Sequence, residues 1–167
     1  MYHFITGYTS KVAGTEMGVT EPVPTFSACY GEAFLPRHPF IYAEKLAEMC
    51  EKYQVKVWLI NTGWVRGGYG VGNRMSLTQT RAIIDSIHDD SLDMSNYNIM
   101  RRFNLKVPQE CFGVDPEILR PINCWPDKES YKVAAKSLAD KFVKNFARYE
   151  SGVPADVVKI GGPNMDF

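Results

Sequence analysis

Residues 55–60 form an apolar run in which only Lys56 is polar. Valine, isoleucine and tryptophan in so short a run are typical of a buried strand. Five glycines follow between residues 63 and 72, too many for a regular element. Ser76 and Gln79 then have the spacing of a capping box, and apolar residues recur at helical spacing over residues 82–87. This pattern predicts a strand, a glycine-rich loop and a capped helix.

Two further segments show helical periodicity. Residues 39–53 carry an apolar stripe and predict an amphipathic helix of about three turns. A longer stripe runs from Tyr131 to Phe146, with Asp127 placed to cap the helix. Residues 103–107 alternate between apolar and polar, which predicts a half-buried strand that Pro108 ends. Helices alternating with strands indicate an α/β fold with helices packed on a mixed sheet.

Other segments have weaker patterns. Residues 2–12 favour a short helix with Phe4, Ile5 and Tyr8 facing inward. Residues 13–25 are rich in glycine, proline and threonine and predict a long loop, which is either a lid over a site or a plain connector. Glycines and prolines after Ser151 predict a loosely ordered tail over residues 151–167.

Composition narrows the function classes. Nineteen basic and nineteen acidic residues cancel, so the charge favours neither nucleic acid nor an anionic membrane as a partner. No apolar run approaches the roughly 20 residues of a transmembrane helix, and the N-terminus does not resemble a signal peptide. The four cysteines are scattered, which favours free thiols in a reducing cytoplasm over disulfides.

Candidate chemistry centres on the glycine-rich loop. Residues 67–73 match neither the P-loop pattern nor GxGxxG, so a phosphate contact and a plain connector both stay open. Arg74 adds a positive fork just before the helix, where N–H groups and the helix dipole favour anions. Thr80, one turn into the helix, offers a hydroxyl on the same side as Ser76. Trp64, Arg66 and Tyr69 are candidates to stack on a base.

Other candidate catalytic residues have weaker support. His3, His38 and His88 do not pair with Cys, Asp or Glu at ligand spacing, so no metal site is expected. Ser27 and Cys29 lie close together, but no base is linked to them in the sequence, and buried small residues are the preferred interpretation.

Several separate motifs, in the same order along the chain, closely resemble the ATP-dependent phosphoenolpyruvate carboxykinases. Among them are Asn-Thr-Gly-Trp at residues 61–64 and Arg-Met-Ser-Leu at residues 74–77. The other motifs that carry the resemblance are residues 2–9, 11–16, 18–22, 25–29, 80–85, 103–104, 108, 113–116 and 118–119. Together they extend over about residues 1–149 and imply membership of this family.

The resemblance implies that residues 1–150 are the C-terminal part of the family's nucleotide-binding lobe. The family converts oxaloacetate and ATP to phosphoenolpyruvate, CO₂ and ADP in cytoplasmic gluconeogenesis, using Mg²⁺ with ATP and Mn²⁺. Its phosphate-binding loop, Mn²⁺ ligands and oxaloacetate-binding arginines lie upstream, and no counterpart is found here. This portion alone is therefore expected to hold no catalytic residue and to be inactive without the N-terminal part of the same polypeptide.

Two functional parts of the family match residues of this chain. Its nucleotide-contacting residues correspond to Arg74, Met75 and Thr80. Its mobile lid corresponds to the loop 13–25, and the matching lid residues are Ala13, Gly14, Thr15, Glu16, Gly18, Thr20 and Glu21. The loop 65–73 is longer than in some relatives. The alternative function is a stand-alone nucleotide-binding or regulatory module without catalytic activity.

Overall fold

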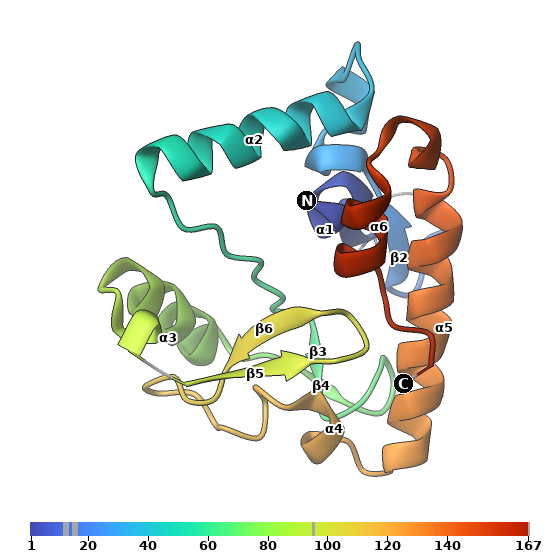
Figure 1. Cartoon of the computed structure of the whole chain (residues 1–167). Helices are drawn as coiled ribbons and strands as arrows, with labels where there is room; N and C mark the ends of the chain where they lie inside the picture. The colour runs from blue at the N-terminus through green and yellow to red at the C-terminus, as the bar shows by residue number, and fades with distance from the viewer. Residues whose placement is uncertain (12–13, 15–16, 95, 167) are drawn as a thin grey trace. The chain divides into compact units, whose positions relative to one another are not determined.

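The computed structural model describes residues 1–11, 14, 17–94 and 96–166 (Figure 1). The chain forms two compact units, each described by itself below. The first unit comprises Met1–Leu59 and Leu138–Phe167, and the second comprises Ile60–Ser137.

The first unit combines helices with one antiparallel hairpin. Its helix α1 contacts α2 and α6. Strands β1 and β2 pair with Tyr8 opposite Phe26 and Lys11 opposite Val23. The elements of the unit are α1 (Tyr2–Thr6), β1 (Tyr8–Lys11), β2 (Val23–Phe26), η1 (Ala28–Tyr30), η2 (Glu32–Phe34), α2 (Pro39–Tyr53), the second half of α5 (Lys128–Phe146), η4 (Glu150–Gly152) and α6 (Ala155–Gly161).

Aromatic side chains from α1, the hairpin and α5 form the core of the first unit. Tyr2 stacks on Phe146 with ring centroids 4.1 Å apart. Phe142 contacts the ring of Tyr8 at 5.3 Å and that of Phe26 at 5.4 Å. Ile5, which also belongs to α1, is fully buried. The apolar stripe predicted on the long helix is therefore confirmed at the positions that meet α1 and the hairpin.

The chain turns sharply between α1 and β1. Gly7 ends the helix in the left-handed region with φ 58°. A Cβ atom there would lie 1.6 Å from the carbonyl oxygen of Ser27, so only glycine fits. The helix predicted over residues 2–12 is correct for α1 and wrong for residues 8–11, which form a strand. The β-branched and aromatic residues after Gly7 pair with β2 instead of continuing the helix.

The C-terminal segment contains regular structure. Residues 155–161 form α6, which Figure 1 shows beside α1. Gly162 is buried, and its N–H donates to the carbonyl oxygen of Val158 at 2.9 Å. A Cβ atom on Gly161 would lie 2.6 Å from Cβ of Tyr2, which shows how closely this segment approaches α1. The glycines that predict a loose tail thus permit close packing here.

The second unit contains two short antiparallel hairpins and helix α3. Strand β3 pairs with β4, and β5 pairs with β6. The strand predicted at residues 103–107 is observed as β6, which begins at Leu105 and includes Pro108, and its partner β5 was not predicted. The elements are β3 (Trp64–Val65), β4 (Asn73–Arg74), α3 (Leu77–His88), η3 (Ser91–Met94), β5 (Tyr97–Met100), β6 (Leu105–Pro108), α4 (Pro121–Cys124) and the first half of α5.

The predicted helix caps are confirmed. Ser76 Oγ accepts a hydrogen bond from the Gln79 N–H at 3.2 Å, and Gln79 Oε1 accepts from the Ser76 hydroxyl. Asp127 accepts from the backbone N–H of Ser130 at 2.7 Å and that of Glu129 at 3.2 Å. These bonds satisfy N–H groups that the first helical turn leaves without partners.

The run at residues 55–60 does not form a strand, so that prediction is wrong for this chain. Figure 1 draws it as coil between α2 and β3. The described strands form three two-stranded sheets, and none of these sheets includes the run. A strand needs a neighbouring segment for its hydrogen bonds, and composition alone does not provide one. The fold is mixed α/β with small sheets in place of the expected larger mixed sheet.

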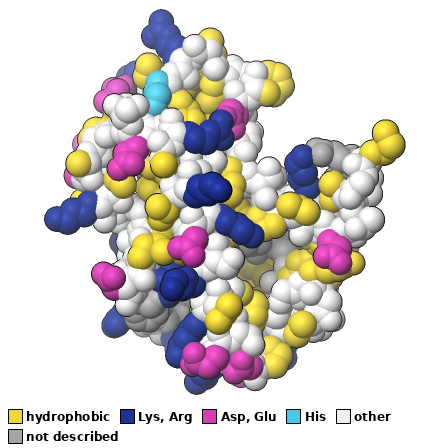
Figure 2. Space-filling model, turned by 90° about the vertical axis from the view of Figure 1, so that its right-hand side faces the viewer, with side chains coloured by type: hydrophobic (Ala, Val, Ile, Leu, Met, Phe, Trp, Pro, Cys, Tyr) yellow, Lys and Arg dark blue, Asp and Glu magenta, His cyan; other side chains and the backbone are white. Residues whose placement is uncertain are grey.

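The surface agrees with the balanced composition. Figure 2 shows Lys and Arg side chains interspersed with Asp and Glu on the face that it displays. All four cysteines are free thiols. Among the described residues, none of the helices has the length and hydropathy that crossing a membrane requires.

Candidate functional site

The glycine-rich loop is the tip of the β3–β4 hairpin. Trp64 pairs with Arg74 and Val65 with Asn73, so residues 66–72 close the turn. Gly67 has φ 142°, and a Cβ atom on Gly72 would lie 2.3 Å from the carbonyl oxygen of Val65. These glycines are explained by the tight turn and the close approach of the backbone to itself. The connector interpretation of the loop is therefore favoured over a phosphate cradle.

An ion pair and an aromatic contact hold this hairpin. Arg66 Nη2 donates to Asp115 Oδ2 at 2.5 Å, and Asp115 Oδ1 accepts from the Glu117 N–H at 3.0 Å. The rings of Trp64 and Tyr69 meet edge to face at 5.3 Å. Arg66, Trp64 and Tyr69 are thus engaged with neighbours in the same unit. They anchor the hairpin that carries Arg74.

Arg74 lies at the end of β4, directly before the capped helix. Its side chain is exposed, and no described residue forms a hydrogen bond or ion pair with its guanidinium. The next residue, Met75, is half-buried, and its N–H donates to the carbonyl oxygen of Gly63 at 3.0 Å. This bond ties the entrance of α3 to the start of the hairpin. The guanidinium of Arg74 remains available to a hydrogen-bond acceptor outside the chain.

Thr80 lies one turn into α3 and is half-buried. Its hydroxyl donates to the carbonyl oxygen of Ser76 at 3.0 Å. The hydroxyl proton is therefore occupied, while the oxygen keeps a lone pair for an external donor. Arg74 thus offers a charged donor just before α3, and Thr80 offers a neutral acceptor in its first turn.

The loop 13–25 joins β1 to β2 in the first unit. Gly14 donates from its N–H to the carbonyl oxygen of Val19 at 3.0 Å, and Gly14 and Gly18 have φ 83° and 84°. Of the expected lid residues, Gly14, Gly18, Thr20 and Glu21 are exposed. Ala13, Thr15 and Glu16 lie outside the described residues. The last residues of the predicted loop, from Val23, already belong to β2.

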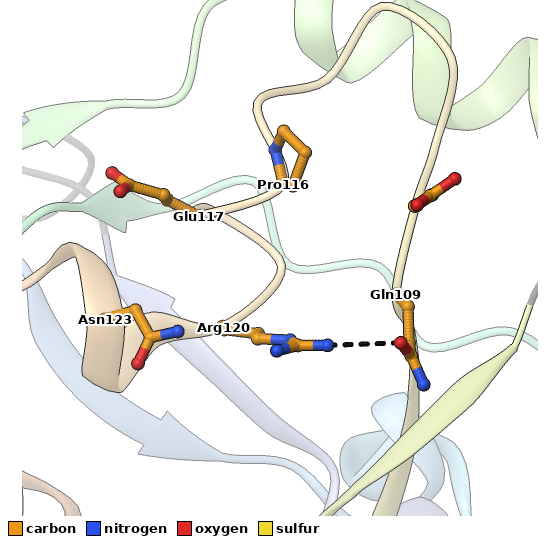
Figure 3. Close-up of a pocket in the computed structure, with 6 residues that line it drawn as sticks. Gln109, Pro116, Glu117, Arg120 and Asn123 are labelled. Atoms are coloured by element: carbon orange, nitrogen blue, oxygen red, sulfur yellow. Dashed lines mark hydrogen bonds between the residues drawn. The ribbon is translucent and has the colours of Figure 1, made fainter.

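Two surface hollows lie in the second unit, and sequence analysis identified neither. Figure 3 shows the smaller, about 230 Å³, in which Arg120 points toward Gln109 and donates to its amide oxygen at 3.2 Å. It is lined by Gln109, Glu110, Pro116, Glu117, Arg120 and Asn123. Apart from Pro116, which belongs to the motif at residues 113–116, no motif marked these residues, because they meet through the turns that follow β6.

The larger hollow, about 630 Å³, lies along α3. Its lining residues are Thr78, Arg81, Ala82, Asp85, Ser86, Asp89, Ser91, Phe112 and Gly113. Arg74, Met75 and Thr80 line neither of these two hollows. Within this unit Arg74 is exposed, and Met75 and Thr80 are half-buried.

The candidate nucleophiles have structural partners. Ser27 Oγ accepts from the Glu32 N–H at 3.1 Å. The Cys29 thiol donates to the carbonyl oxygen of Pro39 at 3.6 Å, and burial raises the pKa of Cys29 to about 11. A thiol with that pKa stays protonated at neutral pH and is a poor nucleophile. Both side chains are half-buried, so they are less buried than predicted, and each has a hydrogen-bond partner in the same unit.

Comparison with known proteins gives consistent matches. A family model described as phosphoenolpyruvate carboxykinase matches residues 1–117. The phosphoenolpyruvate carboxykinase (ATP) of Campylobacter lari is 51% identical over 163 residues, covering 98% of this chain and 31% of the relative. The protein of that name from Fusobacterium nucleatum is 48% identical, covering 96% of the chain and 31% of the relative. The protein of that name from Dictyostelium discoideum is 51% identical, covering 96% of this chain and 29% of the relative. The chain spans about three tenths of the length of these relatives.

Proposed function

This chain belongs to the ATP-dependent phosphoenolpyruvate carboxykinase family, and we propose that it supplies nucleotide contacts and the closing loop of such an enzyme. The reaction proposed for the whole protein converts oxaloacetate and ATP to phosphoenolpyruvate, CO₂ and ADP, a step of gluconeogenesis in the cytoplasm. The 51% identity over nearly the whole chain is the observation that carries this proposal. Residues 1–150 are the C-terminal part of the nucleotide-binding lobe in this assignment.

Arg74 is the principal nucleotide contact in this proposal. Its exposed guanidinium has no described partner, and the tight hairpin behind it limits the orientations of its backbone. A guanidinium donates two parallel hydrogen bonds to paired oxygens, and such charged bonds contribute about 1.5–3 kcal/mol each. Met75 offers an apolar surface to the base. Thr80 accepts a hydrogen bond from a ribose hydroxyl or an exocyclic amine without breaking its bond to Ser76.

The loop 13–25 serves as the lid. Gly14 and Gly18 hold left-handed backbone conformations, and glycine allows such positions to change conformation at low cost. Closing a loop over the bound nucleotide excludes water, which suppresses hydrolysis of ATP and strengthens electrostatic interactions in the site. The exposed side chains of Thr20 and Glu21 are available for polar contacts on closure.

The metal ions are assigned to other parts of the enzyme. ATP brings Mg²⁺, which neutralises phosphate charge during transfer. No group of three or more His, Cys, Asp or Glu side chains is placed to hold a metal ion in the part of the chain that the structure describes. We therefore assign no Mn²⁺ ligand and no phosphoryl-transfer residue to this chain, whose role is to orient the nucleotide and to exclude water.

A chimera tests this proposal. The present chain replaces the matched region of the Campylobacter lari relative, and oxaloacetate decarboxylation is measured at limiting ATP. Arg74→Ala is expected to lower kcat/KM for ATP about 10–100-fold, because a charged hydrogen bond is lost. Arg74→Lys restores only part of the rate, since lysine keeps the charge without the fork.

Arg81→Ala is the matched control. Arg81 is also an exposed arginine, but it belongs to α3 and lines the larger hollow, whereas Arg74 is the last residue of β4. It should leave kcat/KM for ATP within about twofold. Equal kinetics for Arg74→Ala and the unsubstituted chimera would refute the assignment of Arg74. Turnover by the 167-residue chain alone would refute the proposal that the catalytic residues lie outside this chain.

A further inference from the structure

An ion pair ties the loop of the β3–β4 hairpin to the turn that follows β6. Arg66 Nη2 donates to Asp115 Oδ2 at 2.5 Å, although the two residues are 49 positions apart in the sequence. The other carboxylate oxygen, Asp115 Oδ1, accepts from the Glu117 N–H at 3.0 Å, which holds the carboxylate in its own turn. One carboxylate therefore joins the hairpin loop to a turn that is distant in the sequence.

The backbone of Arg66 gives independent support for a specific role of this residue. Its φ is 64°, in the left-handed region that residues other than glycine rarely adopt. Such conformations persist where the surrounding structure holds them, and they are concentrated at functional sites. Glycine would adopt this φ more easily but would make no bond to Asp115. The ion pair is thus a physical reason for an arginine at this position.

The turn that carries Asp115 follows a segment packed against α3. A Cβ atom on Gly113 would lie 3.2 Å from Cβ of Ala82, so the backbone of this segment lies close to the helix. Cys111 Sγ donates to Ser86 Oγ at 3.5 Å, and both of these residues are buried. Asp115 is therefore held two positions beyond a point of close contact with α3.

These contacts fix the hairpin that carries Arg74 at two separate points. At its start, the carbonyl oxygen of Gly63 accepts from the Met75 N–H, next to the entrance of α3. In its loop, Arg66 is bound to Asp115, whose segment packs against the same helix. A hairpin held at both points leaves Arg74 fewer positions than one held only at its start. Such preorganisation lowers the entropy that is lost when a ligand binds.

We propose that Arg66 and Asp115 are positioning residues of the nucleotide site, and that their ion pair holds the hairpin in the arrangement in which Arg74 meets ATP. The ligand in this proposal rests on the function proposed above. Neither residue is assigned a contact with the nucleotide. Because both act through Arg74, loss of the pair should weaken the binding of ATP and leave the chemical step unchanged.

The same ion pair contributes little to overall stability. The Arg66 side chain is 48% exposed and that of Asp115 is 34% exposed, and ion pairs in such contact with water change the free energy of unfolding only slightly. Breaking the pair should therefore leave Tm within about 3 °C. A weaker interaction with ATP at an almost unchanged Tm distinguishes positioning from a general role in folding.

Kinetics of the chimera described above test the proposal. Arg66→Ala is expected to raise KM for ATP about 3–10-fold and to leave kcat within about twofold. Asp115→Asn keeps an acceptor for the Glu117 N–H and removes the charge, so it should raise KM by a smaller factor. An unchanged KM for Arg66→Ala would overturn the proposal. So would a lower kcat at an unchanged KM.

Lys132→Ala is the matched control. Lys132 forms another exposed ion pair, with Glu129 on α5 at 2.6 Å, and this pair has no printed contact with the hairpin in the same unit. Its loss should leave KM for ATP within about 1.5-fold. A rise in KM equal to that of Arg66→Ala would overturn the proposal, because the effect would then follow from the loss of any surface ion pair.

A double substitution tests whether Arg66 acts through Arg74. When Arg74→Ala is already present, Arg66→Ala should raise KM for ATP no further, because the residue that it positions is gone. A rise by the same factor with and without Arg74→Ala would overturn the proposal. A purely structural contribution of Arg66 would be expected to persist in both proteins, so this comparison separates the two roles.

Hydrogen exchange in the free 167-residue chain provides a readout without ATP. The Met75 amide, which donates to Gly63, should exchange about 10-fold faster in Arg66→Ala and at an unchanged rate in Lys132→Ala. Equal rates in Arg66→Ala and the unsubstituted chain would overturn the proposal even if the chimera does not fold. Kinetics unaffected by Arg74→Ala would instead refute the nucleotide contact proposed above, so failures of the two proposals are distinguishable.

Discussion

Helix α5 and the run at residues 55–60 both carry large apolar side chains, and they differ in what covers them. Phe146 of α5 is 2% exposed and stacks on Tyr2, whereas Leu59 of the run is 49% exposed. A helix makes its backbone hydrogen bonds internally and needs neighbours only for its side chains. A strand needs neighbours for side chains and backbone alike. The difference shows that apolar composition alone does not decide which segment is covered.

The largest expected loss of stability comes from a substitution in the aromatic core of the first unit. Phe146→Ala removes a fully buried ring that contacts Tyr2, so it should lower the free energy of unfolding by about 3–5 kcal/mol. Urea denaturation of the free chain measures this loss. Val143→Ala, at an exposed position of the same helix, is the control and should change stability by less than about 0.5 kcal/mol. Similar losses for both variants would contradict the division into a buried and an exposed face.

High pH is expected to cause a smaller loss of stability in the first unit, through the ionisation of Tyr149. Burial and the hydrogen bond that its hydroxyl donates to Glu32 raise the pKa of Tyr149 to about 12. The folded state therefore holds this proton more tightly than the unfolded state, whose tyrosine pKa is about 10. The resulting stability is complete below about pH 10 and is lost as pH rises through about 12.

Tyr149→Phe isolates this contribution. Because phenylalanine does not titrate, the variant should lose less stability than the parent chain between about pH 10 and 12. Urea denaturation at several pH values measures the difference. Partial burial also raises the pKa of Tyr8, so some loss should remain in the variant. Parallel stability curves for the two proteins would contradict the role of Tyr149.

The smallest effect is expected in the uncovered run. Leu59→Ala removes about as much apolar side chain as a core substitution does, yet it should change the stability of the free chain by less than about 0.5 kcal/mol. The reason is that Leu59 is already half in water. Urea denaturation alongside Phe146→Ala makes the comparison direct. A loss of about 2 kcal/mol or more would show that the run is covered in the free chain.

Sequence analysis was most accurate where contacts are local. It predicted α2, α3 and α5, together with the caps at Ser76 and Asp127, because a cap joins residues only two or three positions apart. It missed β5, since residues 97–100 become a strand only when β6 lies beside them. It also missed both hollows, whose walls come from turns and helix faces brought together by folding.

The site was predicted through two signals of different kinds. The capping pattern placed Arg74 and Thr80 at a helix entrance, and the resemblance to the carboxykinases assigned them to ATP. The structure adds that Arg74 is exposed and that the Thr80 hydroxyl already donates to Ser76. It also explains Gly67 and Gly72 by the close approach of the backbone to itself in the loop of the β3–β4 hairpin. The number of glycines alone did not distinguish this role from a phosphate cradle.

The sequence by itself determined the family, the helix periodicities and the helix ends, since these depend on residue identities and on interactions within about one helical turn. The tertiary structure decided which apolar residues are covered. It buried Phe142 and Phe146 against α1 and the first hairpin and left Val55, Val57, Leu59 and Ile60 exposed. The physical reason is that burial and strand pairing both require a second segment. Helix α5 packs against such a segment, whereas none of the described sheets includes residues 55–60.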